Sequence, residues 1–410
     1  MFLKKSTLLA LISIFIGCNE NTNNNEEKEK TYPPSSTLTK RLTDQTILRP
    51  ELNSPTYDPV FNTTINLVNK SDKYISSYPK VQTWSLDMNL LRIGYRLYDN
   101  DLTESSLTKG IKNPYSTLCS PLGDYFRWSN QNSNSFFVLN SSKQFIAGSI
   151  MHKNIDCSQI LFDFKEHGYE YVEMGPNEGN IDNNDEYVTF VVKEYNDDTL
   201  YILLFDISEE KVVWVNPFFE GKWVKKHHWE VETLDWVSVS QSGKYILINT
   251  PNAMYHYDIN FKNQTKLEYN WHGKQYSEGG HGDFCYDTQD QELFVQNIGG
   301  AGVYSFNLEK PSENGKVLLN SPYGGGHISC RNIQRPGWAY ITREEEGYKE
   351  VFALKLDNNT TPNVQEFSQT HAKYGHEESY GAPCPDGTEV IFNSHWGKDK
   401  LDTFVATSIN

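Results

Sequence analysis

The sequence predicts an all-β protein, a seven-bladed β-propeller, from one recurring pattern and from regularly spaced strand pairs. Histidines that follow a glycine recur as His281, His327 and His376, which are 46 and 49 residues apart, and Asp235 lies 46 residues before His281. A period in the forties in strand-rich units is typical of propellers. Because the equivalent position of every blade faces the central channel, we expect these histidines to converge there.

The innermost strands of the blades are expected to start at seven positions, 44 to 56 residues apart. These positions are Trp84, Trp128, Gly179, Asp235, His281, His327 and His376. The first three units are irregular, so six or eight blades also fit the sequence. A strand from residues 50–75 is expected to pair with the last blade and close the ring.

The clearest blade covers residues 237–259, where alternating apolar residues flank the turn Gln241-Ser242-Gly243-Lys244. Such alternation between turn residues predicts strands. Similar strand pairs follow at Glu292–Gln296 with Gly302–Leu308, Trp338–Thr342 with Glu350–Leu356, and Glu389–Asn393 with Thr403–Thr407. In Pro385-Asp386-Gly387 the proline presets φ and the glycine permits a positive φ, so this segment is a predicted turn.

Composition and charge limit the partners. The chain has 410 residues and a net charge of −16, from 37 basic and 53 acidic residues. A nucleic-acid partner is excluded because no extended basic cluster is present, and the short run at residues 222–228 is typical of a solvated loop. Closed repeats can form one large domain, so residues 46–410 are assigned to a single propeller. We expect a monomer.

The N-terminus carries export signals. Residues 1–18 combine basic Lys4 and Lys5, a short apolar run and the sequence Phe15-Ile16-Gly17-Cys18, which resembles a bacterial lipobox with Cys18 as the lipidated residue. The apolar run is too short to span a bilayer. Residues 19–45, rich in Asn, Glu and Lys, are assigned to a disordered tether. We therefore expect an exported protein held on the bacterial envelope only by its lipid; an ordinary secretory signal is the alternative.

Five further cysteines are scattered through the chain at positions 119, 157, 285, 330 and 384. Their odd number argues against a complete disulfide framework. Cys285 and Cys330, just after two of the recurring histidines, are predicted to be small buried residues.

Histidines and one glutamine on successive blades indicate a metal or acid–base site. His281, His327, His371 and His376 form this set with Gln369. Imidazole and amide oxygen together suit a divalent cation, with Mn²⁺ the first choice and Zn²⁺ or Ca²⁺ as alternatives. The other interpretation is that each Gly-His pair starts a strand and its histidine is a hydrogen-bonded core residue.

Several motifs resemble those of oligogalacturonate lyases, which are seven-bladed propeller polysaccharide lyases; propeller ulvan lyases are a second relative. These motifs are Gly280-His281-Gly282-Asp283-Phe284-Cys285, Gly326-His327, Gln369-Thr370-His371 with Gly375-His376, and Pro385–Ser394. The resemblance covers roughly residues 230–400. It implies that His281 is the catalytic histidine and that His327, Gln369, His371 and His376 hold Mn²⁺. The family's arginine before the catalytic histidine is absent, and His256 lies near that place.

The implied reaction is β-elimination in an anionic polysaccharide or oligosaccharide that contains uronic acid, of the oligogalacturonate or ulvan type. A cation must neutralise the uronate carboxylate, a base must remove the C5 proton, and an acid assists departure of the C4 oxygen. Arg127 and Arg331 are candidate carboxylate clamps, and Tyr380 or Tyr276 is the candidate acid. The alternative function is a non-catalytic cell-surface propeller that binds glycan or protein.

Overall fold

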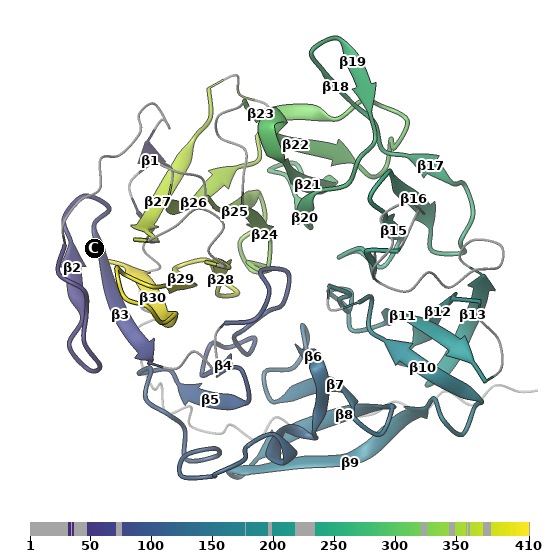
Figure 1. Ribbon diagram of the computed structural model, residues 1–410, viewed down its shortest axis with the longest axis horizontal. Coiled ribbons are helices and arrows are strands. Elements are labelled where there is room, and N and C mark those ends of the chain that lie inside the picture. Colours follow the sequence, from purple (N-terminus) through teal and green to yellow (C-terminus); the bar gives the residue numbers. More distant parts are fainter. Residues whose placement is uncertain are drawn as a thin grey trace, which may run out of the picture. The chain divides into compact units, whose positions relative to one another are not determined.

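Six sheets of four or five antiparallel strands surround a central axis (Figure 1). The computed structural model describes residues 32–33, 35–36, 47–70, 76–176, 178–195, 199–217, 234–320, 326–343, 349–357, 359, 361–371 and 379–409. All of them belong to the unit Thr31–Asn410. Among these residues no helix is both long and apolar enough to cross a membrane. Cys18 and His376 lie outside the described residues.

Four blades have four strands each, and every blade is named here by its first strand. The β6 blade contains β6 (Pro121–Trp128), β7 (Ser135–Asn140), β8 (Gln144–Met151) and β9 (Asn154–Asp163). The β10 blade contains β10 (Tyr169–Glu173), β11 (Tyr187–Glu194), β12 (Tyr201–Asp206) and β13 (Lys211–Pro217). The β14 blade contains β14 (Trp236–Val239), β15 (Tyr245–Asn249), β16 (Met254–Asp258) and β17 (Thr265–Lys266). The β20 blade contains β20 (His281–Tyr286), β21 (Glu292–Ile298), β22 (Gly302–Asn307) and β23 (Lys316–Asn320).

Two blades have five strands because segments from the start of the chain join them. The β24 blade contains β24 (His327–Ser329), β25 (Trp338–Thr342), β26 (Glu350–Lys355), β27 (Val364–Gln369) and β1 (Ser35–Ser36). The β28 blade contains β28 (Ala382–Pro383), β29 (Glu389–Ser394), β30 (Asp402–Ser408), β3 (Thr63–Asn69) and β2 (Thr56–Asp58). Strand β1 lies within the segment assigned to the tether.

The expectation of seven blades is wrong, because the described residues form six, one of the alternatives that the irregular first units left open. The unit predicted to start at Trp84 makes only the two-stranded sheet of β4 (Leu90–Ile93) and β5 (Arg96–Asp99). Its flanking segments contribute single bridges, Trp84 to Leu91 and Tyr98 to Glu104. Outside the blades lie the hairpin of β18 (Tyr269–Trp271) and β19 (Lys274–Tyr276) and two short 3₁₀ helices, η1 (Ser116–Leu118) and η2 (Gly299–Ala301).

The ring closes as the sequence predicts. Strand β3, from the start of the chain, pairs with β30, from its end, in a register that runs from Thr63 opposite Ser408 to Asn69 opposite Thr403. The Arg49 guanidinium forms an ion pair with the Asp402 carboxylate at the same junction. The pairing removes an exposed edge from β30.

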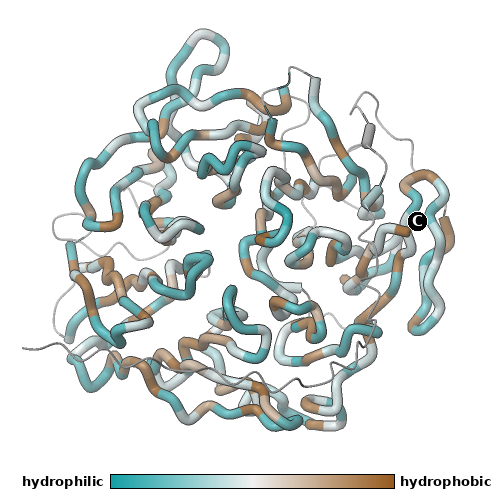
Figure 2. The backbone as a smooth tube through the Cα atoms, turned by 180° about the vertical axis from the view of Figure 1, so that it is seen from behind, coloured by the Kyte–Doolittle hydropathy of each residue, from teal (hydrophilic) through white to brown (hydrophobic). Residues whose placement is uncertain are grey.

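Apolar side chains fill the spaces within and between the blades. Hydrophobic positions are spread through all the blades, as Figure 2 shows. Strand β3 alternates buried and partly exposed residues over most of its length, as a sheet with one packed face requires. Trp84, Trp128 and Trp236 are among the largest fully buried side chains. Burial of a large apolar side chain contributes roughly 1.5–3 kcal/mol, so these rings are major sources of stability.

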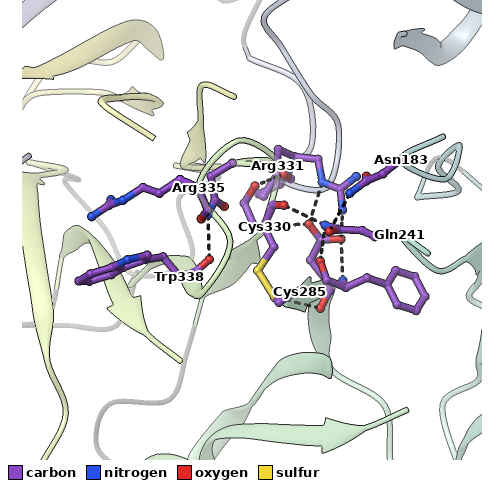
Figure 3. The surroundings of a disulfide bond; sticks show 12 residues. Asn183, Gln241, Cys285, Cys330, Arg331, Arg335 and Trp338 are labelled. Atoms are coloured by element: carbon purple, nitrogen blue, oxygen red, sulfur yellow. Dashed lines mark hydrogen bonds and ion pairs between the residues drawn. A yellow bond between two sulfur atoms is a disulfide. The ribbon is translucent and has the colours of Figure 1, made fainter. Parts of the chain in front are cut away.

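The expectation that Cys285 and Cys330 are buried is confirmed, but four of the five cysteines also form disulfides, which were not predicted from the sequence. Cys119 is joined to Cys157, and Cys285 is joined to Cys330 (Figure 3). The unpaired Cys384 is buried and makes the total odd. Cys285 and Cys330 are 45 residues apart, close to one blade period; Cys285 lies in β20, and Cys330 directly follows β24, the inner strand of the next blade.

Candidate functional site

The predicted histidines His281 and His327 begin β20 and β24, the inner strands of adjacent blades. Each follows a glycine that packs tightly against the second strand of its blade. A Cβ added to Gly280 would collide with the carbonyl oxygen of Asn297, and one added to Gly326 would collide with that of Thr342. Gly326 also has a φ of +107°, which disfavours other residues. The glycines thus allow both strands to start with a histidine at the axis.

Four aromatic side chains form one cluster at this place, called here the axial cluster: Tyr78, His281, His327 and Tyr380. The imidazole centroids of His281 and His327 are 4.5 Å apart. The Tyr78 ring packs edge-on against His327 at 5.2 Å and against Tyr380 at 5.4 Å. Tyr380 in turn contacts His327 edge-on at 5.0 Å. The Tyr78 hydroxyl and Nδ1 of His281 share a hydrogen bond of 2.7 Å.

Tyr78 is a residue that the sequence did not point to. It lies in the axial segment, residues 76–82, between the closing strand β3 and the first short sheet. This segment contacts all six blades, through partners listed here: Asp124, Glu178, Asn180, Trp236, His281, Ser329, Arg331 and Asn393. Figure 1 shows it as a purple loop near the centre of the ring. No local motif marks such a segment, because most of the contacts that hold it to the blades are distant in sequence.

A buried ion pair lies beside the axial cluster. Nζ of Lys80 is 2.7 Å from Oε2 of Glu178, and the two side chains are 3% and 15% exposed. The ammonium also lies 3.4 Å from the centre of the Trp236 ring, a cation–π contact. Burial raises the pKa of Glu178, while Lys80 opposes this shift. The Lys80 side chain is thus held between a carboxylate and an aromatic ring and is shielded from solvent.

Burial lowers the pKa of His281 to about 4, with smaller contributions from His327 and Lys80. The residue nevertheless keeps an exposed edge. Both facts fit a ring that lines a channel, where one side meets water and protein surrounds the rest. His327, whose ring contacts that of His281, is only 8% exposed. His281 is therefore neutral at pH 7 and is the histidine of the pair that a ligand can reach.

Several cross-blade contacts fix the spacing of the two histidine strands. The Asp283 carboxylate accepts hydrogen bonds from Nε of Arg331 at 3.0 Å and from its terminal nitrogen at 2.8 Å. Nε2 of Gln241 donates to the carbonyl oxygens of Phe284 and Cys330 at 2.6 and 2.9 Å. The Cys285–Cys330 disulfide lies among these groups (Figure 3). The Asp283–Arg331 pair and the disulfide join β20 to the segment that follows β24, and Gln241, from the turn between β14 and β15, bridges the same two segments.

Protein partners engage both predicted arginine clamps. Arg331 is 3% exposed and forms the ion pair with Asp283 described above. Arg127 is also 3% exposed and donates to the carbonyl oxygens of Gly179, Asp124 and Phe126. A buried guanidinium needs such acceptors. Burial lowers the pKa of Arg127 to about 10, which leaves it charged at neutral pH.

The remaining predicted residues lie apart from the axial cluster. His256 is on β16, the third strand of its blade, where it packs on Tyr245 at 4.9 Å. Gln369 ends β27, opposite Glu350, and His371 stacks on Trp396 at 3.9 Å. Tyr380, the predicted acid, is the exception, because its ring contacts that of His327 within the axial cluster.

The described residues do not make a complete metal site. Within the ranges given above, no group of three or more His, Cys, Asp and Glu side chains lies close enough to hold an ion. The axial cluster offers two imidazoles, and Gln369 and His371 do not join them. The donor set present therefore does not fit Mn²⁺ by itself. The predicted ligand His376 is outside the described residues.

Comparison with solved structures reveals the same fold in oligogalacturonate lyases. One such enzyme, solved in complex with manganese, aligns with a TM-score of 0.57 and 10% identity over 87% of this chain and 96% of that one. The oligogalacturonate lyase of Vibrio parahaemolyticus aligns with a TM-score of 0.56 and 10% identity over 86% and 96%. No family model matches the sequence, and no curated protein does. The resemblance found in the motifs is thus confirmed for the fold, and that to ulvan lyases stays a prediction.

Proposed function

We propose that this protein is a polysaccharide lyase that cleaves a uronic-acid-containing polysaccharide or oligosaccharide by β-elimination. The observation that carries the proposal is the axial cluster, where a neutral, reachable histidine is hydrogen-bonded to a tyrosine. The fold shared with oligogalacturonate lyases supports the same reaction class.

The chemistry of the cluster suits proton abstraction beside a carboxylate. The C5 hydrogen of a uronate is weakly acidic, so its removal needs a base in the correct protonation state. Because burial lowers the pKa of His281 to about 4, its imidazole retains a free lone pair at neutral pH. The walls that desolvate the ring also strengthen its electrostatic interactions with a bound sugar.

His281→Ala should abolish unsaturated product while the protein remains folded. Loss of a general base typically costs about 10²–10⁴ in rate. The assay follows the far-ultraviolet absorbance of the new C4–C5 double bond with a panel of uronate polymers, and thermal unfolding serves as the folding control. If the wild type yields no such product but binds a glycan, the protein is the non-catalytic binding propeller instead.

We also propose a bound divalent cation, with Mn²⁺ as the first choice and Zn²⁺ or Ca²⁺ as alternatives. The described residues alone do not complete a metal site, but the predicted ligands also include His376, which lies outside them. We expect the purified protein to carry such an ion and His327→Ala to lose it. His371→Ala is the matched variant. It should lose the ion only if the predicted ligands at the end of β27, Gln369 and His371, also bind it. Metal analysis of both variants and the wild type makes this comparison. A wild type that binds none of the three ions, even when they are added, would exclude the metal.

Location and partners complete the proposal. The lipobox-like sequence supports export and attachment through Cys18 to the bacterial envelope, on the periplasmic or outer face of the outer membrane. A soluble enzyme domain on a lipid tether can meet an anionic polymer as its only required partner. We propose that the protein acts there as a monomer.

A further inference from the structure

The hairpin of β18 and β19 carries a further inference, which rests on the proposed lyase function. We propose that Trp271 and Lys274 on this hairpin form a sugar-binding subsite for a uronate unit of a long substrate chain, away from the bond that is cleaved. The tryptophan ring stacks on the sugar, and the lysine ammonium binds its carboxylate. The hairpin stands outside the six blades, and Figure 1 shows it projecting from the ring beside β22 and β23.

The register of the hairpin places the two residues on one face. Trp271 and Lys274 are directly opposite partners, and Asn270 and Gln275 form the next pair away from the tip. Because side chains alternate between the two faces of a strand, the first pair projects to one side and the second pair to the other. The Glu268 carboxylate accepts a hydrogen bond from Gln275 and so belongs to the second side. The aromatic ring and the ammonium thus share a face from which this carboxylate is turned away.

The tip of the hairpin keeps these groups accessible. His272 and Gly273 form its two-residue turn, and their φ angles of 48° and 73° are those of a tight hairpin turn. Lys274 is exposed, and Trp271 is partly buried. The Trp271 ring packs against His272 at 4.8 Å and against Tyr276 at 5.9 Å between centroids. The ring is therefore held in place by its own hairpin, which lowers the entropy that a bound sugar would cost.

Two exposed glycines connect the Trp271 ring with the strands of the axial cluster. His281 is paired with Asn297 on β21, and Gly299 and Gly300 follow directly after this strand. A Cβ added to Gly299 would meet nothing within 4 Å, and one added to Gly300 would meet only Trp271, at 3.9 Å. From Asn297 to Gly300 the chain spans at most about 11 Å. An extended polymer can therefore reach from the axis across open backbone to Trp271 within a few sugar units.

The chemistry of a uronate polymer matches this pair. The C–H bonds on one side of a pyranose ring make an apolar face that packs on an aromatic ring. A carboxylate forms a charge-assisted hydrogen bond with an ammonium group. The chain carries a net charge of −16, which repels an anionic polymer, so a local cation is needed where the polymer crosses the surface. The subsite thus favours long chains over the shortest oligosaccharide that can be cleaved.

The test uses the full-length protein with polygalacturonate, β-1,4-glucuronan, ulvan and alginate as probes. Affinity gel electrophoresis measures binding, and the absorbance of unsaturated product gives kcat and KM. Trp271→Ala should weaken binding of a retained polymer about tenfold or more. It should raise KM for that polymer by a similar factor at unchanged kcat, and leave KM for the shortest cleaved oligosaccharide unchanged. Lys274→Gln should weaken binding and reduce its dependence on salt.

Matched variants change an aromatic and a basic residue elsewhere on the surface. Tyr195→Ala changes a tyrosine that is 50% exposed just after β11, and Lys109→Gln changes an exposed lysine after β5. Both should bind and cleave as the wild type does. Thermal unfolding checks that every variant is folded. Lys274→Gln still tests the subsite if Trp271→Ala does not fold, because its side chain is exposed.

The other outcomes separate this inference from the proposed function. Cleavage of a polymer with unchanged KM in folded Trp271→Ala and Lys274→Gln refutes the subsite and leaves the lyase function standing. Weaker binding by these two variants, without product from any polymer, supports the subsite and refutes the lyase function. Equal losses in the matched variants, or a wild type retained by none of the four polymers, refute the subsite.

Discussion

Single residues illustrate how one physical effect can have two consequences. Burial lowers the pKa of both His281 and His256 to about 4. His281 keeps an exposed edge and a tyrosine partner, so its neutral state is available for chemistry. His256 is 4% exposed within a blade, so its neutral state serves packing only. A shifted pKa therefore indicates a site only together with access and a partner.

His256 should make the protein sensitive to acid. Between pH 6.5 and 4 the unfolded chain binds a proton at this residue that the folded chain does not, so stability falls as the pH is lowered through this window. His256→Leu should reduce the loss of unfolding free energy between pH 7 and pH 5 by about 2 kcal/mol. Urea denaturation at the two pH values measures it, with the exposed His152→Leu as control. An unchanged pH dependence in His256→Leu would contradict this explanation.

At the scale of elements, the sequence predicts what depends on local pattern. The strand pairs at residues 292–308, 338–356 and 389–407 appear where apolar alternation places them, and the two Gly-His pairs start inner strands. Trp128, by contrast, ends β6 instead of starting it. The irregular unit after Trp84 forms only a short sheet. Its two strands have four residues each, and the segments beside them add only single bridges.

The parts of the site that the sequence missed depend on contacts between distant elements. Tyr78 contacts His281, 203 positions further along the chain, and Lys80 pairs with Glu178, which is also distant in sequence. Local periodicity contains no information on such pairs. The Cys285–Cys330 disulfide could have been found, since its separation nearly equals the blade period. The buried roles of Arg127 and Arg331 could not have been found, because a sequence does not reveal which guanidinium group has hydrogen-bond acceptors around it.

For the whole molecule, closure of the ring is the feature on which the axial site depends. Strand β3 ends at Asn69, and the axial segment begins at residue 76, a few positions later. This segment then contacts every blade. If β3 leaves β30, the start of this segment loses its attachment and β30 gains an exposed edge. The position of Tyr78 against His281 is therefore coupled to the pairing of the two ends of the propeller.

A truncation series tests this coupling. A variant that begins at residue 47 keeps β2 and β3 and should unfold in one cooperative transition close to that of the full chain. A variant that begins at residue 71 loses the buried side chains of Ile65 and Leu67, worth roughly 1.5–3 kcal/mol each, together with the whole β3–β30 pairing. We expect it to lose the cooperative transition in circular dichroism and to aggregate through its exposed β30 edge. Equal midpoints for the two variants would mean that the ring is stable while open, and that the axial segment is held by the inner strands alone.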